Sequence, residues 1–64
     1  MMVSAHAQAV KNAATRARRR GEDVYVVYES GQYDTATEEE LDTFYAGIAA
    51  ANILERVSAD GRVS

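Results

Sequence analysis

The feature that most constrains the fold is a short strand that is apolar on both faces and is followed by a tight turn. Residues 24–29 are rich in β-branched and aromatic side chains, and Ser30-Gly31 supplies a two-residue turn into a second strand, residues 32–36. Because such a turn sets the register, Tyr28 is expected to face Tyr33. The sequence therefore predicts a β-hairpin near the centre of the chain.

Alternate residues of a strand point to opposite faces, so the hairpin side chains fall into two sets. The set expected to face the core is Val24, Val26, Tyr28, Tyr33 and Thr35. The opposite set is Tyr25, Val27, Glu29, Gln32 and Asp34. If helices cover only the core face, the second face is left open, with an apolar centre and a polar rim that are typical of a binding surface.

A helix is predicted on each side of the hairpin. In the first, one stripe has helical spacing, and the run ends in arginines followed by Gly21 as a C-cap. The residues of this stripe are Val3, Ala7, Val10, Ala14 and Ala17. In the second, Thr37 and Glu40 have the spacing of a capping box. The apolar face expected for the second helix is Leu41, Phe44, Tyr45 and Ile48.

The last segment allows two interpretations. Ile53, Glu55 and Val57 alternate with more polar residues before the turn at Asp60-Gly61, which favours a third strand, although the alanines at 49–51 could extend the second helix. The preferred order is αββαβ, an α+β fold of one domain over residues 1–64. Both helices are expected on one face of a small antiparallel or mixed three-stranded sheet.

Composition argues against most classes of site chemistry. The 64 residues include no cysteine, a single histidine (His6) and four isolated glycines, so no thiolate metal site, nucleophile–base pair or phosphate-binding loop is recognisable. We expect no enzymatic activity, metal, cofactor or small-molecule substrate. The absence of cysteine fits a reducing cytoplasm, and no apolar run is long enough for a signal peptide or a membrane span.

Charge is divided between the two parts of the chain. Residues 1–20 contain five cations and no acid, whereas residues 21–64 contain ten acids and two arginines. Four of the cations form the cluster Arg16, Arg18, Arg19 and Arg20. This cluster could contact phosphates of a nucleic acid, or it could simply complement the dipole at the end of a helix.

The acids of the hairpin end and of the second helix are close enough in sequence to form one negative surface. They are Glu29, Asp34, Glu38, Glu39, Glu40 and Asp42. Their ordinary roles would be solubility and helix capping, but such a surface also suits a lysine- and arginine-rich groove on a partner. Tyr25 is the aromatic residue expected to point outward and to anchor such a contact, whereas Tyr28, Tyr33 and Tyr45 are expected in or beside the core.

The segments VYVVYESGQYDTATEEELDTFYAG and NILERVSADGRV resemble small orphan proteins of bacteriophages and prophages. In size, acidity, lack of cysteine and order of elements, the chain looks most like anti-CRISPR proteins that inhibit type I systems of pseudomonads. The resemblance implies a location in the host bacterial cytoplasm. It also implies binding to the multisubunit surveillance complex or its nuclease, with an acidic surface that mimics DNA. The resemblance includes no shared motif, so it assigns no functional role to any residue of this chain.

Three hypotheses follow. The first is a non-enzymatic inhibitor that binds a basic nucleic-acid groove of a CRISPR surveillance complex through the acidic surface. The second is a small nucleic-acid-binding or regulatory protein that uses the arginine cluster. The third is a homodimer that buries the open face of the sheet, so the chain is expected to be a monomer or a weak homodimer.

Overall fold

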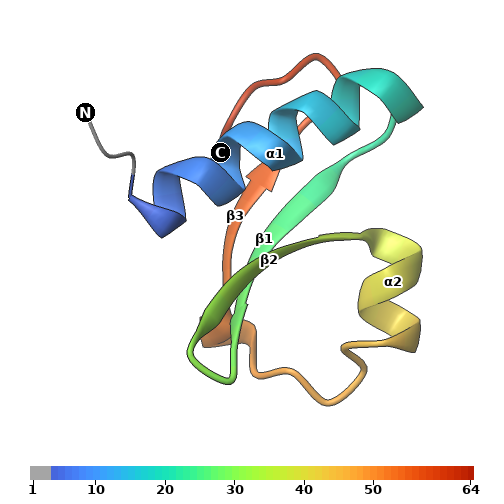
Figure 1. The fold of residues 1–64 in the computed structure, drawn as a ribbon. Helices are drawn as coiled ribbons and strands as arrows, with labels where there is room; N and C mark the ends of the chain where they lie inside the picture. The colour runs from blue at the N-terminus through green and yellow to red at the C-terminus, as the bar shows by residue number, and fades with distance from the viewer. Residues whose placement is uncertain (1–3) are drawn as a thin grey trace.

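The computed structural model describes residues 4–64, which form two helices and one antiparallel sheet (Figure 1). In chain order the elements are α1 (Ala5–Arg20), β1 (Val24–Glu29), β2 (Gln32–Thr37), α2 (Glu38–Thr43), the 3-10 helix η1 (Ala50–Asn52) and β3 (Ile53–Val57). The strands lie in the order β2-β1-β3, with β1 in the centre. The α+β class, the αββαβ order and the third strand are therefore confirmed. Val3, expected on the first helix, lies outside the described residues.

The hairpin of β1 and β2 has the expected register. Tyr28 pairs with Tyr33 and Glu29 with Gln32, which leaves Ser30 and Gly31 as the two turn residues. Both have positive φ, 52° at Ser30 and 78° at Gly31. Positive φ at both central positions defines the type I′ turn, whose twist matches that of paired strands.

The first helix ends where its sequence predicts. Gly21 has φ 65°, and its N–H donates to the carbonyl of Ala17 at 2.8 Å, which satisfies one of the last free carbonyls. The stripe that faces the sheet is Ala9, Ala13 and Ala17, with Val10 and Ala14 partly buried beside it. The predicted stripe was wrong at Ala7, which is exposed. Alanine occurs on most sides of this helix, so the sheet, and not the helix alone, decides which alanines are buried.

The core is built from small side chains. Its buried members are Ala9, Ala13, Ala17, Val24, Val26 and Val57. The largest side chains that are fully buried in residues 4–64 are valines. Because alanine projects so little from the helix, α1 can approach the sheet closely and pack against these valines.

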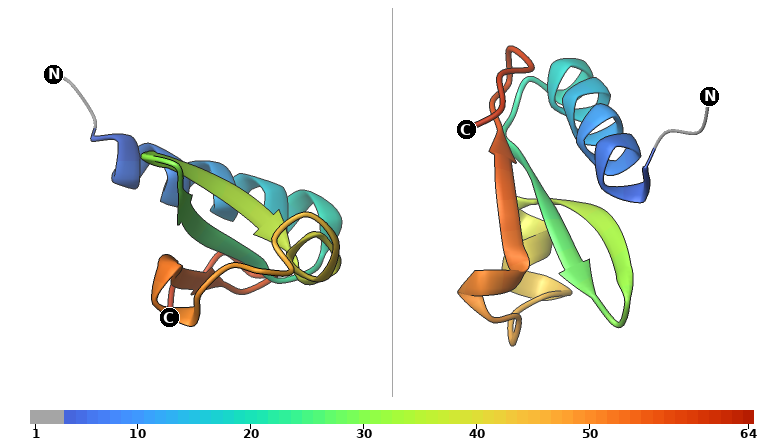
Figure 2. Two further views of the ribbon diagram at one scale, coloured as in Figure 1. Left: turned by 90° about the horizontal axis from the view of Figure 1, so that it is seen from below. Right: turned by 90° about the vertical axis from the view of Figure 1, so that its left-hand side faces the viewer.

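The face of the sheet opposite α1 is not open. Val27 and Ala36, which belong to that face by register, are 0% exposed. Figures 1 and 2 show α1 on one side of the sheet, while α2 continues from the end of β2 and the segment after it crosses the other side toward β3. Both helices were expected on one face; α1 covers that face, and α2, which begins directly after Thr37 at the end of β2, contacts α1 through Arg16 and Glu40.

Helix α2 is shorter than its apolar spacing predicts. It ends at Thr43, and Phe44 is 75% exposed, so Leu41, Phe44 and Tyr45 do not form one continuous helical face. The Thr43 hydroxyl donates to the carbonyl of Glu39 at 2.9 Å, a bond that competes with regular helix continuation. Glycine follows at position 47, which further disfavours helix.

Both outer edges of the sheet are partly closed. On β2, the N–H of Thr35 donates to Oδ1 of Asp34 at 2.7 Å, and its carbonyl accepts from Nη1 of Arg16 at 3.3 Å. On β3, Arg56 and Ser64 exchange two backbone hydrogen bonds. Unpaired strand edges attract other chains, so these bonds protect the sheet from edge-to-edge pairing.

Candidate partner-binding surface

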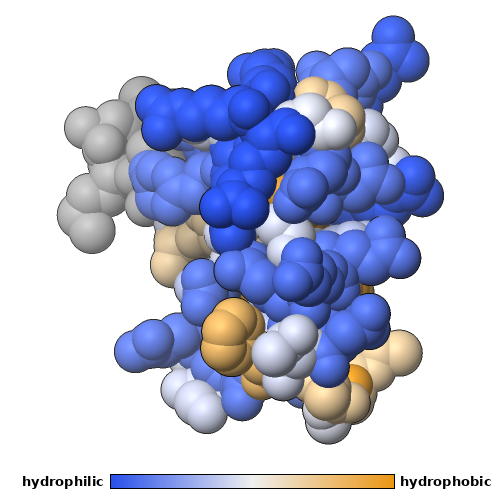
Figure 3. All heavy atoms as spheres, turned by 90° about the vertical axis from the view of Figure 1, so that its right-hand side faces the viewer, coloured by the Kyte–Doolittle hydropathy of each residue, from blue (hydrophilic) through white to orange (hydrophobic). Residues whose placement is uncertain are grey.

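The predicted acidic residues divide into two groups in space. Glu38, Glu39, Glu40 and Asp42 belong to α2, whereas Glu29 and Asp34 flank the tip of the hairpin. All are exposed except Glu40, which is half-buried. Figure 3 shows that the side of the molecule bearing α2 is mostly hydrophilic, with separate apolar spots.

The α2 group is larger than the sequence suggested. Glu38 and Glu39 line one surface hollow together with Glu22 and Asp23; this is called the α2 hollow below. The register explains the meeting, because Val24 at the start of β1 pairs with Thr37 at the end of β2. Residues just before β1 therefore lie beside residues just after β2. This proximity could have been predicted from the hairpin register.

Not all these carboxylates are available to a partner. Asp23 pairs with Arg56, whose Nη2 lies 2.9 Å from its Oδ2. Among residues 4–64, Glu22, Glu38 and Glu39 make no ion pair. The α2 hollow therefore combines three free carboxylates with one that is neutralised within the protein.

Glu40 serves the fold. Its Oε1 accepts from the N–H of Thr37 at 2.9 Å and lies 2.7 Å from Nη2 of Arg16, and the Thr37 hydroxyl completes the predicted capping box. The Arg16 side chain, followed by the Thr37 N–H, lowers the pKa of Glu40 to about 2. A carboxylate held in this way is ill suited to an exchangeable contact with another molecule.

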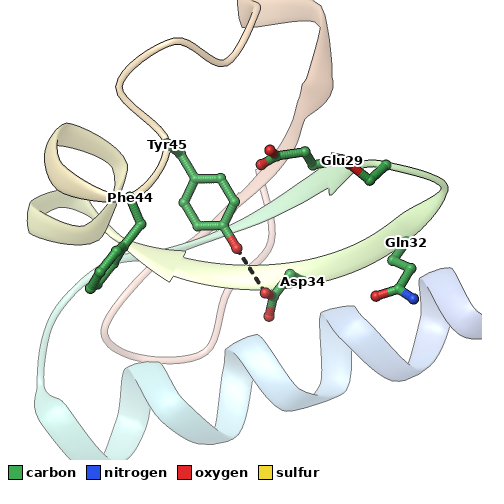
Figure 4. Close-up of a pocket in the computed structure, with 6 residues that line it drawn as sticks. Glu29, Gln32, Asp34, Phe44 and Tyr45 are labelled. Atoms are coloured by element: carbon green, nitrogen blue, oxygen red, sulfur yellow. Dashed lines mark hydrogen bonds between the residues drawn. The ribbon is translucent and has the colours of Figure 1, made fainter.

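The hairpin group borders a second hollow, shown in Figure 4 and called the hairpin hollow below. It is lined by Glu29, Ser30, Gln32, Asp34, Phe44 and Tyr45. The hydroxyl of Tyr45 donates to Oδ2 of Asp34 at 2.7 Å. This bond, followed by burial, raises the pKa of Tyr45 to about 12 because it stabilises the protonated phenol.

Tyr25 is less available than expected. It lies on the face opposite α1, paired with Ala36 and Arg56, and it is half-buried. Phe44 is the most exposed large apolar side chain of the described residues. Sequence reasoning missed Phe44 because the spacing placed it on the inner face of a longer helix.

The arginine cluster is also partly committed to the fold. Arg16 contacts Glu40 and the Thr35 carbonyl, and the guanidinium of Arg18 lies against Gly61. The remaining two, Arg19 and Arg20, line a hollow on α1 with Asn12, Thr15 and Arg16. Only part of the predicted cluster is thus free for a ligand.

His6 has neighbours that the sequence did not reveal. Its Nε2 lies 2.9 Å from Oε1 of Glu55, close enough for an ion pair but not aligned as a hydrogen bond. Its ring stacks on Tyr33 with centroids 5.2 Å apart. In residues 4–64, no three His, Asp or Glu side chains gather as metal ligands, and no helix has the length and apolar character to cross a bilayer.

Comparison with known proteins yields no relative: no family model, curated protein or solved structure matches the chain. The class is therefore defined by the fold, an α+β protein with a three-stranded antiparallel sheet. Its candidate site is a pair of acidic hollows, one of which has an aromatic wall.

Proposed function

We propose that the protein is a non-enzymatic inhibitor that binds a basic nucleic-acid groove of a bacterial CRISPR surveillance complex. The observation that carries the proposal is the α2 hollow, where the exposed Glu22, Glu38 and Glu39 gather and form no ion pair within residues 4–64. The likeness of the central sequence to anti-CRISPR proteins supplies the kind of partner.

The mechanism is competition for cations. A groove that holds nucleic acid presents lysine and arginine to phosphates, and carboxylates at suitable positions can take the place of those phosphates. Complementary charge speeds the encounter and orients the two molecules. Glu22 comes from the turn between α1 and β1, while Glu38 and Glu39 come from α2, so two parts of the fold fix the spacing of the charges.

The test is the affinity for a purified type I surveillance complex. We expect the double variant Glu38→Lys/Glu39→Lys to bind at least about tenfold more weakly, because two attractive contacts become repulsive. Asp60→Lys, a single charge reversal at the exposed turn where Asp60 pairs with Arg62, is the control and should bind normally. Equal affinity of the double variant and the wild type would refute the proposal, provided circular dichroism shows both folded.

A second candidate function is nucleic-acid binding through Arg19 and Arg20. The hollow that they share with Asn12 and Thr15 favours it, since hydroxyl and amide groups commonly join arginine in phosphate contacts. Gel mobility of duplex and single-stranded DNA at two salt concentrations separates the candidates. A phosphate binder must weaken steeply as salt rises, and Arg19→Ala/Arg20→Ala must abolish the shift.

A further inference from the structure

The hairpin hollow combines aromatic and acidic groups in a way that the α2 hollow does not. Phe44 and Tyr45 supply rings, Glu29 and Asp34 supply carboxylates, and Gln32 supplies an amide (Figure 4). From this combination we infer that the hairpin hollow binds the guanidinium of an arginine side chain from the partner's basic surface. The inference rests on the proposed function for its biological setting, but the recognition itself can be tested without the partner.

Asp34 and Tyr45 are already fixed in place. Oδ1 of Asp34 accepts from the N–H of Thr35, while Oδ2 accepts from the hydroxyl of Tyr45. These two bonds hold the carboxylate on β2 and orient the phenol ring beside it. A preorganised wall loses little side-chain entropy when a ligand arrives, which favours binding.

Glu29 and Phe44 provide the free groups. Glu29 is exposed and makes no ion pair within residues 4–64, so its charge is available. The ring of Phe44 is exposed and lines the same hollow on the other side of Tyr45 (Figure 4), and a planar cation can lie over such a ring. Each carboxylate can also accept hydrogen bonds from the guanidinium.

The surroundings suit arginine better than lysine. Glu29, Phe44 and Tyr45 also line an adjoining hollow with Ile48 and Asn52, so the same wall continues along segment 44–52. The methylene stem of an arginine can lie on this partly apolar extension while its head reaches the carboxylates. A guanidinium stacks on rings and forms paired hydrogen bonds with carboxylates, whereas an ammonium is a compact and strongly hydrated charge.

The test is a nuclear magnetic resonance titration of the whole chain with ethylguanidinium chloride. Ethylammonium chloride is the comparison cation, and sodium chloride controls for ionic strength. We expect saturable shifts of the backbone amides of Glu29, Phe44 and Tyr45, with ethylguanidinium binding more tightly than ethylammonium. Glu29→Gln and Phe44→Ala should each weaken ethylguanidinium binding about two- to fivefold, the range of an exposed cation–aromatic contact.

Glu38→Gln removes the same charge from the α2 hollow and should leave the titration unchanged. Shifts that do not saturate, shifts centred on α2, or equal response to the two organic cations would each overturn the inference. If the wild-type protein binds ethylguanidinium as expected but does not bind the surveillance complex, the result would count against the proposed function alone. Complex binding that is unaffected by Phe44→Ala and Glu29→Gln would count against the arginine contact alone.

Discussion

Arg16 of α1 and Glu40 of α2 are joined by a 2.7 Å contact between Nη2 and Oε1, and each also binds backbone of the β2 edge. Arg16 donates to the carbonyl of Thr35, and Glu40 accepts from the N–H of Thr37. One ion pair thus ties two helices to a strand that would otherwise present a free edge. It is the main polar link between the N-terminal and central parts of the chain.

The first prediction concerns this pair. Arg16→Ala should lower the free energy of unfolding by about 1–3 kcal/mol, because charge-assisted hydrogen bonds to Glu40 and Thr35 are lost. Arg19→Ala, an exposed arginine on the same helix, is the control and should change it by less than about 0.5 kcal/mol. Urea unfolding followed by circular dichroism gives both values.

A double-mutant cycle of Arg16→Ala with Glu40→Ala separates the pair from the cap. If the contact matters, the two effects will fall short of additivity by about 0.5 kcal/mol or more. Strictly additive losses would show that Glu40 acts only through the capping box.

The second prediction is an acid dependence of stability. The pKa of Glu40 falls from its ordinary value of 4.5 to about 2 in the folded protein, so the folded state favours the ionised form. The stabilisation from Glu40 is therefore fully present well above pH 4.5 and is lost as the pH falls toward 2. Unfolding midpoints measured across this range should fall less for Glu40→Gln than for the wild type. An identical slope for Glu40→Gln and the wild type would contradict the assignment.

The third prediction concerns the bond between Tyr45 and Asp34. The phenol of Tyr45 should ionise near pH 12. Its contribution to stability should be fully present below pH 10 and should be lost as the pH rises from 10 through about 12. When tyrosinate formation is followed by ultraviolet absorbance, the titration curve of Tyr45→Phe should lack a component at high pH that the wild type shows. Asp34→Asn should move that component down toward 10, because the neutral amide no longer opposes the phenolate charge. No movement in Asp34→Asn would show that burial and the charges of Glu29 and Glu40, and not Asp34, raise the pKa of Tyr45.

The fourth prediction concerns Gly61, whose φ is 88°. A Cβ at this position would lie 2.6 Å from Nε of Arg18. Gly61→Ala should therefore cost about 1–3 kcal/mol through backbone strain and displacement of the guanidinium. Gly47→Ala, where a Cβ meets nothing within 4 Å, is the matched control and should be close to neutral. In the background of Arg18→Ala, part of the cost of Gly61→Ala should disappear.

Most of the fold could be predicted from local patterns in the sequence. The hairpin register, the capping box of Thr37 and Glu40, and the C-cap at Gly21 depend on residues a few positions apart, and all three were predicted. The third strand also followed from its own alternation. These features need no knowledge of where distant segments lie.

Features that depend on long-range placement were missed. The end of α2 at Thr43 and the path of segment 44–52 decide which face of the sheet is covered, and no local pattern reveals that path. The meeting of His6 with Glu55 likewise depends on how α1 lies across β3. For the site, the acids were found from composition, but neither the exposure of Phe44 nor the half-burial of Tyr25 was foreseen.

Apart from Thr37, the buried side chains of residues 4–64 are alanine and valine, which leaves the aromatic rings to the outside. All five aromatic residues lie within residues 4–64, and each keeps part of its side chain accessible to solvent. The buried packing of the fold is thus aliphatic, while its aromatic side chains reach the surface. Substitution of an outer ring therefore changes the surface of the protein while the aliphatic interior keeps its shape.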